Sequence, residues 1–156
     1  MKFIVHGGTL SRSLQSIYSV ITTNNAVPIL ENFLFQLEEK TLSITASDIE
    51  TTVTVKLELT DADASGLNQI AVPAKILSDI VKTFSNVPLS FIVDEENYSI
   101  EITSGEGKYK LTGLSAEDYP RIATIEDASR ITIPSSLLVN AISKTIFATG
   151  VEETRP

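Results

Sequence analysis

Few residues in this chain have the types and spacing that catalysis needs. His6 is the single histidine and the chain has no cysteine, so Ser–His and Cys–His nucleophile pairs have almost nothing to build on. The absence of cysteine also excludes a disulfide framework, a Cys-based zinc site and an iron–sulfur centre. These features argue against most classes of enzyme.

Two pairs of carboxylates are the remaining candidates for metal binding or acid–base chemistry. Asp48 and Glu50 lie two residues apart in a predicted strand, and paired carboxylates can bind a hard cation. No third or fourth oxygen ligand lies near them in the sequence, so a metal-dependent hydrolase is the weakest hypothesis. Asp61 and Asp63 are interpreted as turn formers. The sequence therefore predicts no enzyme, no catalytic residue, no metal and no cofactor.

The composition is that of a folded but strongly acidic domain. Of the 156 residues, 42% are hydrophobic and 21% are charged, which is enough apolar material for a core. The formal net charge is −8, whereas a nucleic-acid-binding protein usually has an excess of basic residues. The sequence contains no secretory signal and no membrane-spanning run, so we expect a cytoplasmic protein without membrane contact.

Most of the sequence predicts short, largely antiparallel strands separated by polar turns. The clearest example is 52–59, where apolar and polar side chains alternate with the period of a half-buried strand. Further strands are predicted around 33–35, 42–46, 91–93, 98–102 and 109–113, with turns at 38–40, 61–66, 94–97 and 104–107.

Three segments have the apolar spacing of amphipathic helices instead: 9–21, 74–84 and 135–148. In the second of them, Ile76, Leu77, Ile80, Val81 and Phe84 form the apolar stripe. At 100° per residue, the two lysines of this helix are predicted on the face opposite Ile80 and Phe84.

Charge is distributed unevenly between the predicted helices and the rest of the chain. Each helix has one more basic than acidic residue, so the acidic residues are concentrated in strands and turns. Sparse cations on a polar face suit a polyanion that is bound weakly, because each firm phosphate contact adds salt-dependent affinity. The alternative is that these are ordinary solvated helix faces. On the first interpretation, the DNA-facing cations are Arg12, Lys75, Lys82 and Lys144.

The start and the end of the chain resemble each other. With a shift of 128 positions, Phe3-Ile4-Val5 aligns with Ile131-Thr132-Ile133, and the helix that follows aligns as well. A period this long indicates repeated domains, since solenoid repeats span roughly 20–50 residues. We therefore expect a first domain at 1–127 and the strand and helix of a truncated second copy at 128–156, which makes the chain a fragment. The alternative is that any strand–helix pair would align in this way. Without covering strands, the helix of the second copy should expose Leu138, Ile142 and Ile146.

Several short segments occur in an order and at spacings that are specific when taken together. They are Met1-Lys2-Phe3, Pro28-Ile29-Leu30, Asn32-Phe33-Leu34, residues 41–50, Val72-Pro73-Ala74-Lys75, Ser104-Gly105 and 114–120. These segments resemble the N-terminal part of the bacterial sliding clamps, the β subunits of DNA polymerase III, and the match runs through essentially all 156 residues.

The resemblance implies an α+β DNA-clamp fold, with antiparallel sheets and two helices per domain on one face. It implies a processivity factor, a homodimeric ring that encircles double-stranded DNA. It also implies as partners the replicative polymerase, the clamp loader and other proteins with clamp-binding motifs. A non-catalytic protein-interaction β-module without a DNA role is the alternative.

Site residues follow from the resemblance position by position. Lys75 matches a basic, DNA-facing residue of the family, and Asn24 matches a loop position that is often basic there. Arg155 matches an arginine at the rim of the family's partner-peptide pocket. The strand that meets the partner subunit contains Lys108, Tyr109 and Leu111, although Tyr109 and Leu111 also fit an ordinary strand core.

Overall fold

The chain forms two compact units, Met1–Ile122 and Ala123–Pro156. The computed structural model describes residues 1–22, 27–84, 86–105, 107–120, 129 and 131–150. The first unit contains β1 (Lys2–His6), α1 (Gly7–Ile17), η1 (Tyr18–Val20), η2 (Pro28–Glu31), β2 (Asn32–Glu38), β3 (Thr41–Ser47), β4 (Thr52–Glu58), β5 (Asp61–Asp63), β6 (Gln69–Pro73), α2 (Ala74–Lys82), β7 (Pro88–Val93), β8 (Ser99–Ser104) and β9 (Gly107–Thr112).

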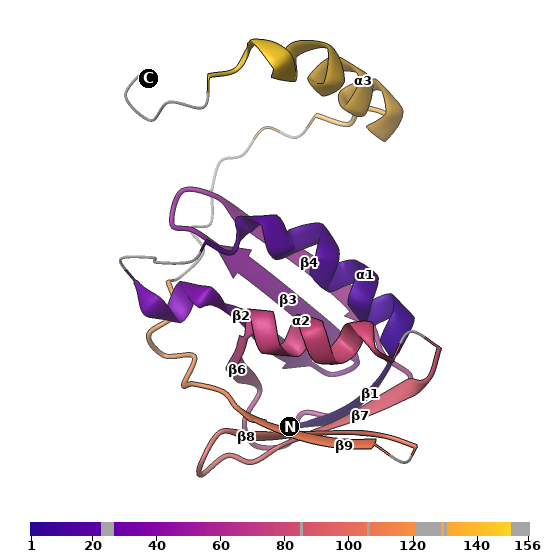
Figure 1. Ribbon diagram of the computed structural model, residues 1–156, viewed down its shortest axis with the longest axis vertical. Coiled ribbons are helices and arrows are strands. Elements are labelled where there is room, and N and C mark those ends of the chain that lie inside the picture. Colours follow the sequence, from indigo (N-terminus) through magenta and orange to yellow (C-terminus); the bar gives the residue numbers. More distant parts are fainter. Residues whose placement is uncertain (23–26, 85, 106, 121–128, 130, 151–156) are drawn as a thin grey trace. The chain divides into compact units, whose positions relative to one another are not determined.

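The strands of the first unit form two antiparallel sheets. The five-stranded sheet has the order β5-β1-β7-β8-β9, and the four-stranded sheet has the order β4-β3-β2-β6. Helices α1 and α2 lie side by side, α1 over β3 and β4 and α2 over β2 and β6 (Figure 1). This arrangement confirms the predicted fold class.

Two sequence predictions about carboxylates are wrong. Asp61 and Asp63 belong to β5, because pairing with β1 places them opposite Ile4 and Lys2 and extends the sheet. Hydrogen bonds from Ser65 also lower the pKa of Asp63. Asp48 and Glu50, expected within a strand, lie in the tight turn between β3 and β4.

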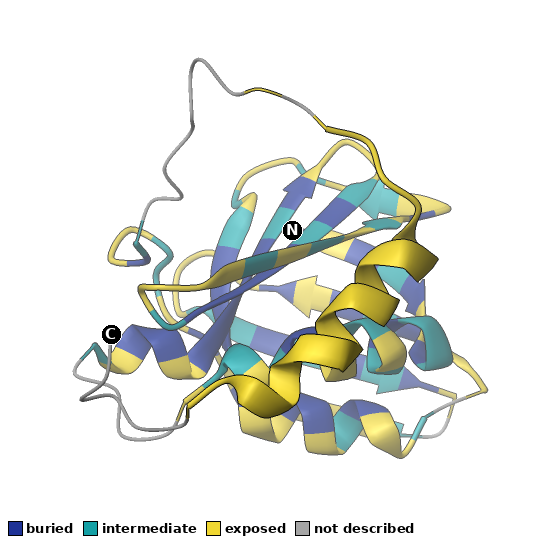
Figure 2. Ribbon diagram, turned by 90° about the horizontal axis from the view of Figure 1, so that it is seen from above, coloured by how far each residue is buried: buried dark blue, intermediate teal, exposed yellow. Residues whose placement is uncertain are grey.

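One core joins both sheets and both helices. Buried residues alternate with more exposed ones along β1, β7 and β8, whereas β2 and β6 are buried almost continuously; Figure 2 colours the chain by burial. Phe3 of β1 stacks on Phe91 of β7 with ring centroids 4.8 Å apart and an interplanar angle of 8°. Phe3 also approaches Phe35 of β2 at 6.4 Å, so it links the two sheets. These rings fix the position of the sheets that support the helices.

A second, smaller cluster covers the other face of β2. It consists of Ile29, Leu30, Leu34, Ala71 and Tyr119. The Tyr119 hydroxyl lies 3.4 Å from the carbonyl oxygens of Asn32 and Thr45 and donates to them. Burial of this phenol disfavours its charged form and raises the pKa of Tyr119 to about 12.

This pKa predicts alkaline destabilisation that depends on Tyr119. The unfolded chain loses the phenolic proton near pH 10 and the folded chain near pH 12, so stability falls as pH rises through this window. Urea unfolding at about pH 9 and about pH 11 should show a larger loss for the parent than for Tyr119→Phe. Tyr18→Phe, on half-exposed η1, is the control; equal losses in parent and Tyr119→Phe would contradict this prediction.

Both helices begin directly after a strand. Strand β1 ends at His6 and α1 begins at Gly7, while β6 ends at Pro73 and α2 begins at Ala74. The backbone N–H of Gly7 donates to the Val87 carbonyl at 2.9 Å, so the start of α1 is bonded to the segment after α2. A side chain at Gly7 would collide with the Phe84 carbonyl, so only glycine allows this close approach.

The second unit repeats the helical geometry of the first. Helix α3 (Ser135–Thr145) and η3 (Ile146–Ala148) begin and end 128 residues after α1 and η1. As expected, the apolar residues of this helix are exposed, with Leu138 at 46%, Ile142 at 49% and Ile146 at 59%. The strand expected at 131–133 is not formed, because β1 owes its geometry to pairing with β5 and β7.

Candidate nucleic-acid interface

Helix α1 presents a polar face with one cation. Leu10, Leu14 and Ile17 are buried in the core, and Arg12 lies on the exposed side as predicted. The Arg12 Nε donates to the Gly8 carbonyl at 3.2 Å, which holds the side chain along the helix surface.

Helix α2 is oriented differently from the prediction. Its buried stripe is Ala74, Leu77, Ser78 and Val81. Ile76, expected in the stripe, is 55% exposed. The helix is rotated relative to the prediction, because the side that carries these four residues packs inward. Lys75 and Lys82 are exposed and flank the stripe instead of lying directly opposite it.

The lysines of α2 remain available to a ligand. Lys82 pairs with Asp79 at 3.6 Å, but both side chains are more than half exposed, and such pairs contribute little to stability. Lys75 forms no salt bridge with any described residue. Within α1 and α2, Asp79 is the one acidic residue. We call the exposed side of these two helices, with Arg12, Lys75 and Lys82, the cationic helical surface.

Three predicted site residues, Lys144, Asn24 and Arg155, do not belong to the described part of the first unit. Lys144 is exposed on α3, in the second unit. Asn24 and Arg155 lie outside the described residues.

The edge strand β9 presents a second candidate surface. Tyr109 is 40% exposed and makes an edge-to-face contact with Phe84, with ring centroids 5.5 Å apart. Lys108 is exposed and pairs with Glu101 at 2.8 Å, which lowers the pKa of that carboxyl. Leu111, by contrast, is 7% exposed and packs in the unit's own core, so its side chain is not presented for an interface. The sequence analysis placed Phe84 only in the apolar stripe of its helix and did not predict its contact with Tyr109.

Asp48 and Glu50, the two carboxylates of the metal-dependent hydrolase hypothesis, lie in the turn between β3 and β4. The Asp48 Oδ1 accepts hydrogen bonds from the backbone N–H groups of Glu50 and Thr51, at 3.1 and 2.7 Å, and so stabilises the turn. Among the described residues, no group of three or more His, Cys, Asp or Glu side chains is placed to hold a metal ion. In the same part of the chain, no helix is long and apolar enough to cross a membrane.

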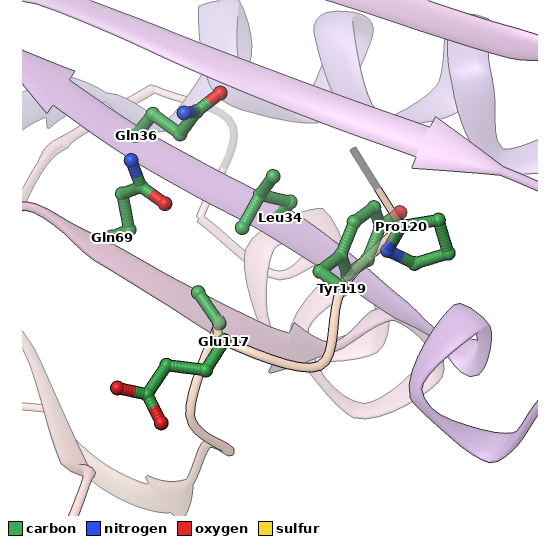
Figure 3. A pocket seen from close by; sticks show the side chains of 7 residues that line it. Leu34, Gln36, Gln69, Glu117, Tyr119 and Pro120 are labelled. Carbon is green, nitrogen blue, oxygen red and sulfur yellow. The ribbon is translucent and has the colours of Figure 1, made fainter. Parts of the chain in front are cut away.

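A cleft of about 520 Å³ lies on the face of the four-stranded sheet that carries Tyr119 (Figure 3). Gln36 and Gln69, which are paired across β2 and β6, line the cleft from the sheet, and Glu117 lines it from the covering loop (Figure 3). Two amides and one carboxylate can bond a polar group, and none of the described residues that line this cleft is a cation.

Two antiparallel sheets that share one core with a pair of adjacent helices define a DNA-clamp domain. The chain belongs to the DNA polymerase III beta subunit family: the model of that family's N-terminal domain matches residues 1–123.

Relatives and solved structures agree with this assignment. The chain is 30% identical to the beta sliding clamp of Bacillus subtilis and 32% identical to that of Caulobacter vibrioides, over 100% and 99% of its length. It superimposes on the Bacillus subtilis clamp structure with a TM-score of 0.88 at 29% identity, and on that from Pseudomonas aeruginosa with 0.87 at 29%. The two structural alignments include 100% and 99% of the residues of this chain. The chain spans 41–42% of the length of these relatives.

Proposed function

We propose that this chain supplies the first domain, and the start of the second, of a cytoplasmic sliding clamp that encircles duplex DNA and holds a replicative polymerase on it. The cationic helical surface is the observation that carries this proposal. Its cations are exposed and sparse, while all the acidic residues of the described part of the unit except Glu31 and Asp79 lie in strands and turns. A surface of this kind attracts the DNA backbone without holding it at one position.

The clamp has no catalytic step of its own in this proposal. Topological enclosure keeps the ring on DNA, so few phosphate contacts are needed and each can exchange rapidly as the ring moves. Arg12, Lys75 and Lys82 guide the DNA through the first domain, and Lys144 has the same role in the second. The repeated bounds of α1 and α3 support the assignment of 128–156 to a second copy.

Closure of the ring requires contact between subunits, which we assign to β9. As an edge strand, it has backbone groups free to pair with a strand of another chain. Tyr109 and Phe84 add an apolar contact next to this edge, and Lys108 adds a charge. Polymerase and clamp-loader motifs would bind elsewhere, in the pocket to which Arg155 contributes its rim.

The experiment that tests enclosure compares circular and linear DNA. Clamp subunits that carry this N-terminal sequence are loaded on a nicked circular plasmid and separated from free protein by gel filtration. We expect the clamp to stay with the circle and to be lost once a restriction enzyme linearises it. Subunits with Tyr109→Asp should fail to remain on the circle, because the ring does not close. Retention on linear DNA with free ends would contradict the proposal.

A protein-interaction module without a DNA role is the second candidate. The net charge of −8 and the exposed edge strand β9 favour it. It predicts that removing the cations of α1 and α2 has no effect on DNA binding.

A further inference from the structure

A groove of about 290 Å³ lies between the two helices of the cationic helical surface. The helices run in opposite directions (Figure 1), and the N–H of Gly7 at the start of α1 donates to the Val87 carbonyl after the end of α2. The groove is lined by Gln15, Tyr18, Ser19, Ser78 and Lys82.

Ser78 is the unusual residue of this groove. It lies on the buried stripe of α2 and is 6% exposed, yet its Oγ has no hydrogen-bond partner among the described residues. Buried hydroxyls are almost always paired, so an unpaired one at the base of an open groove is placed to bond a ligand that enters it. A larger apolar residue at this position would fill the groove.

The other lining groups define what such a ligand must be. Lys82 contributes an ammonium, and Gln15 contributes an amide of which one N–H bonds the Ser11 hydroxyl at 3.1 Å. None of the described residues that line the groove has a carboxylate, and Asp79, which pairs with Lys82, is not among them. The ring of Tyr18 supplies an apolar wall. Donors beside an apolar wall fit a phosphate group attached to a C–H-rich sugar.

We infer that this groove receives one sugar–phosphate unit of the DNA backbone, with Ser78 and Lys82 donating to phosphate oxygens and Tyr18 packing against the sugar. The inference rests on the proposed function, since it needs DNA to pass over α1 and α2. Hydroxyls and amides often bond phosphates in protein–DNA complexes. A hydroxyl contact adds affinity without displacing a counterion, so it leaves the salt dependence of binding unchanged.

The test is an NMR titration of ¹⁵N-labelled chain with a short DNA duplex. We expect the amide signals of Ser19 and Ser78 and the side-chain NH₂ of Gln15 to shift. Ser78→Ala should weaken binding by about 3- to 10-fold, the range of one lost hydrogen bond, with an unchanged salt slope. Ser78→Thr, which keeps the hydroxyl, should restore affinity. Ser90→Ala, on the outward face of β7, is the matched control and should bind like the parent.

The outcomes separate this inference from the proposed function. If Ser78→Ala binds DNA like the parent while charge reversal at Arg12 and Lys75 abolishes binding, the groove inference is wrong and the proposed function stands. If neither change has an effect, both are wrong. A parallel titration uses inorganic phosphate alone. Equal shifts at Gln15 and Ser78 with equal affinity would mark a site for free phosphate and overturn the assignment to the DNA backbone.

Discussion

Replacing Arg12, Lys75 and Lys82 together by glutamate is expected to weaken the binding of duplex DNA by this chain strongly. Three exposed cations are lost from the cationic helical surface and three anions take their place. Each neutralised phosphate contributes about −0.9 to the slope of log K against log salt, so the slope should fall by roughly 3. The measurement is an NMR or anisotropy titration with a short duplex from about 50 to 200 mM salt.

A matched control variant distinguishes the effect of where the cations lie from the effect of the net charge of the chain. Lys2, Lys40 and Lys56 are exposed on β1, in the β2–β3 turn and on β4, outside the two helices. Their joint replacement by glutamate changes the net charge by the same amount. We expect this variant to keep most of the affinity and the slope of the parent. Equal losses in the two triple variants would mean that total charge, and not the helical surface, governs binding.

Phe91→Ala is expected to destabilise the first unit by about 3–5 kcal/mol, the usual cost of removing a buried phenyl ring. Phe91 is 1% exposed and stacks on Phe3, which in turn links the two sheets. Because folded domains have only about 5–15 kcal/mol of stability, this single change should remove much of it. Urea unfolding followed by far-UV circular dichroism measures the loss.

Ile92→Ala is the control on the same strand. Ile92 follows Phe91 but points to the other face and is 44% exposed. Its truncation should therefore cost less than about 1 kcal/mol, as for most exposed positions. A cost for Ile92→Ala as large as that for Phe91→Ala would show that strand propensity, and not the stacked core, explains the effect.

Local patterns predicted most of the fold. Alternation over 52–59 corresponds to β4, and the period of three to four residues over 9–21 corresponds to α1 and η1. The shift of 128 residues, found from a few aligned apolar side chains, matches the helix bounds of the second unit. The strand and helix patterns are local, since each depends on side chains only a few residues apart, and the repeat is found by comparing two such local patterns.

Features that depend on tertiary packing were not predictable in the same way. β5 has the composition of a turn and becomes a strand only because the edge of β1 is free to pair with it. The exposure of Ile76 and the burial of Ser78 follow from how α2 packs against α1, which no spacing within α2 reveals. The groove between the helices was missed for the same reason. The exposed positions of Arg12, Lys75 and Lys82 were predictable, because charged side chains rarely lie in a core.

The direct junctions of β1 with α1 and of β6 with α2 leave no hinge at either helix start. A rotation or translation of either helix would therefore displace the strand before it from its register in the sheet. In the proposed clamp, accommodation to bent, nicked or mismatched duplexes then comes from the rotamers of Arg12, Lys75 and Lys82, and exposed side chains change rotamer within picoseconds to nanoseconds. In such a clamp the backbone of the two helices would stay rigid while their exposed side chains exchange contacts along the moving duplex.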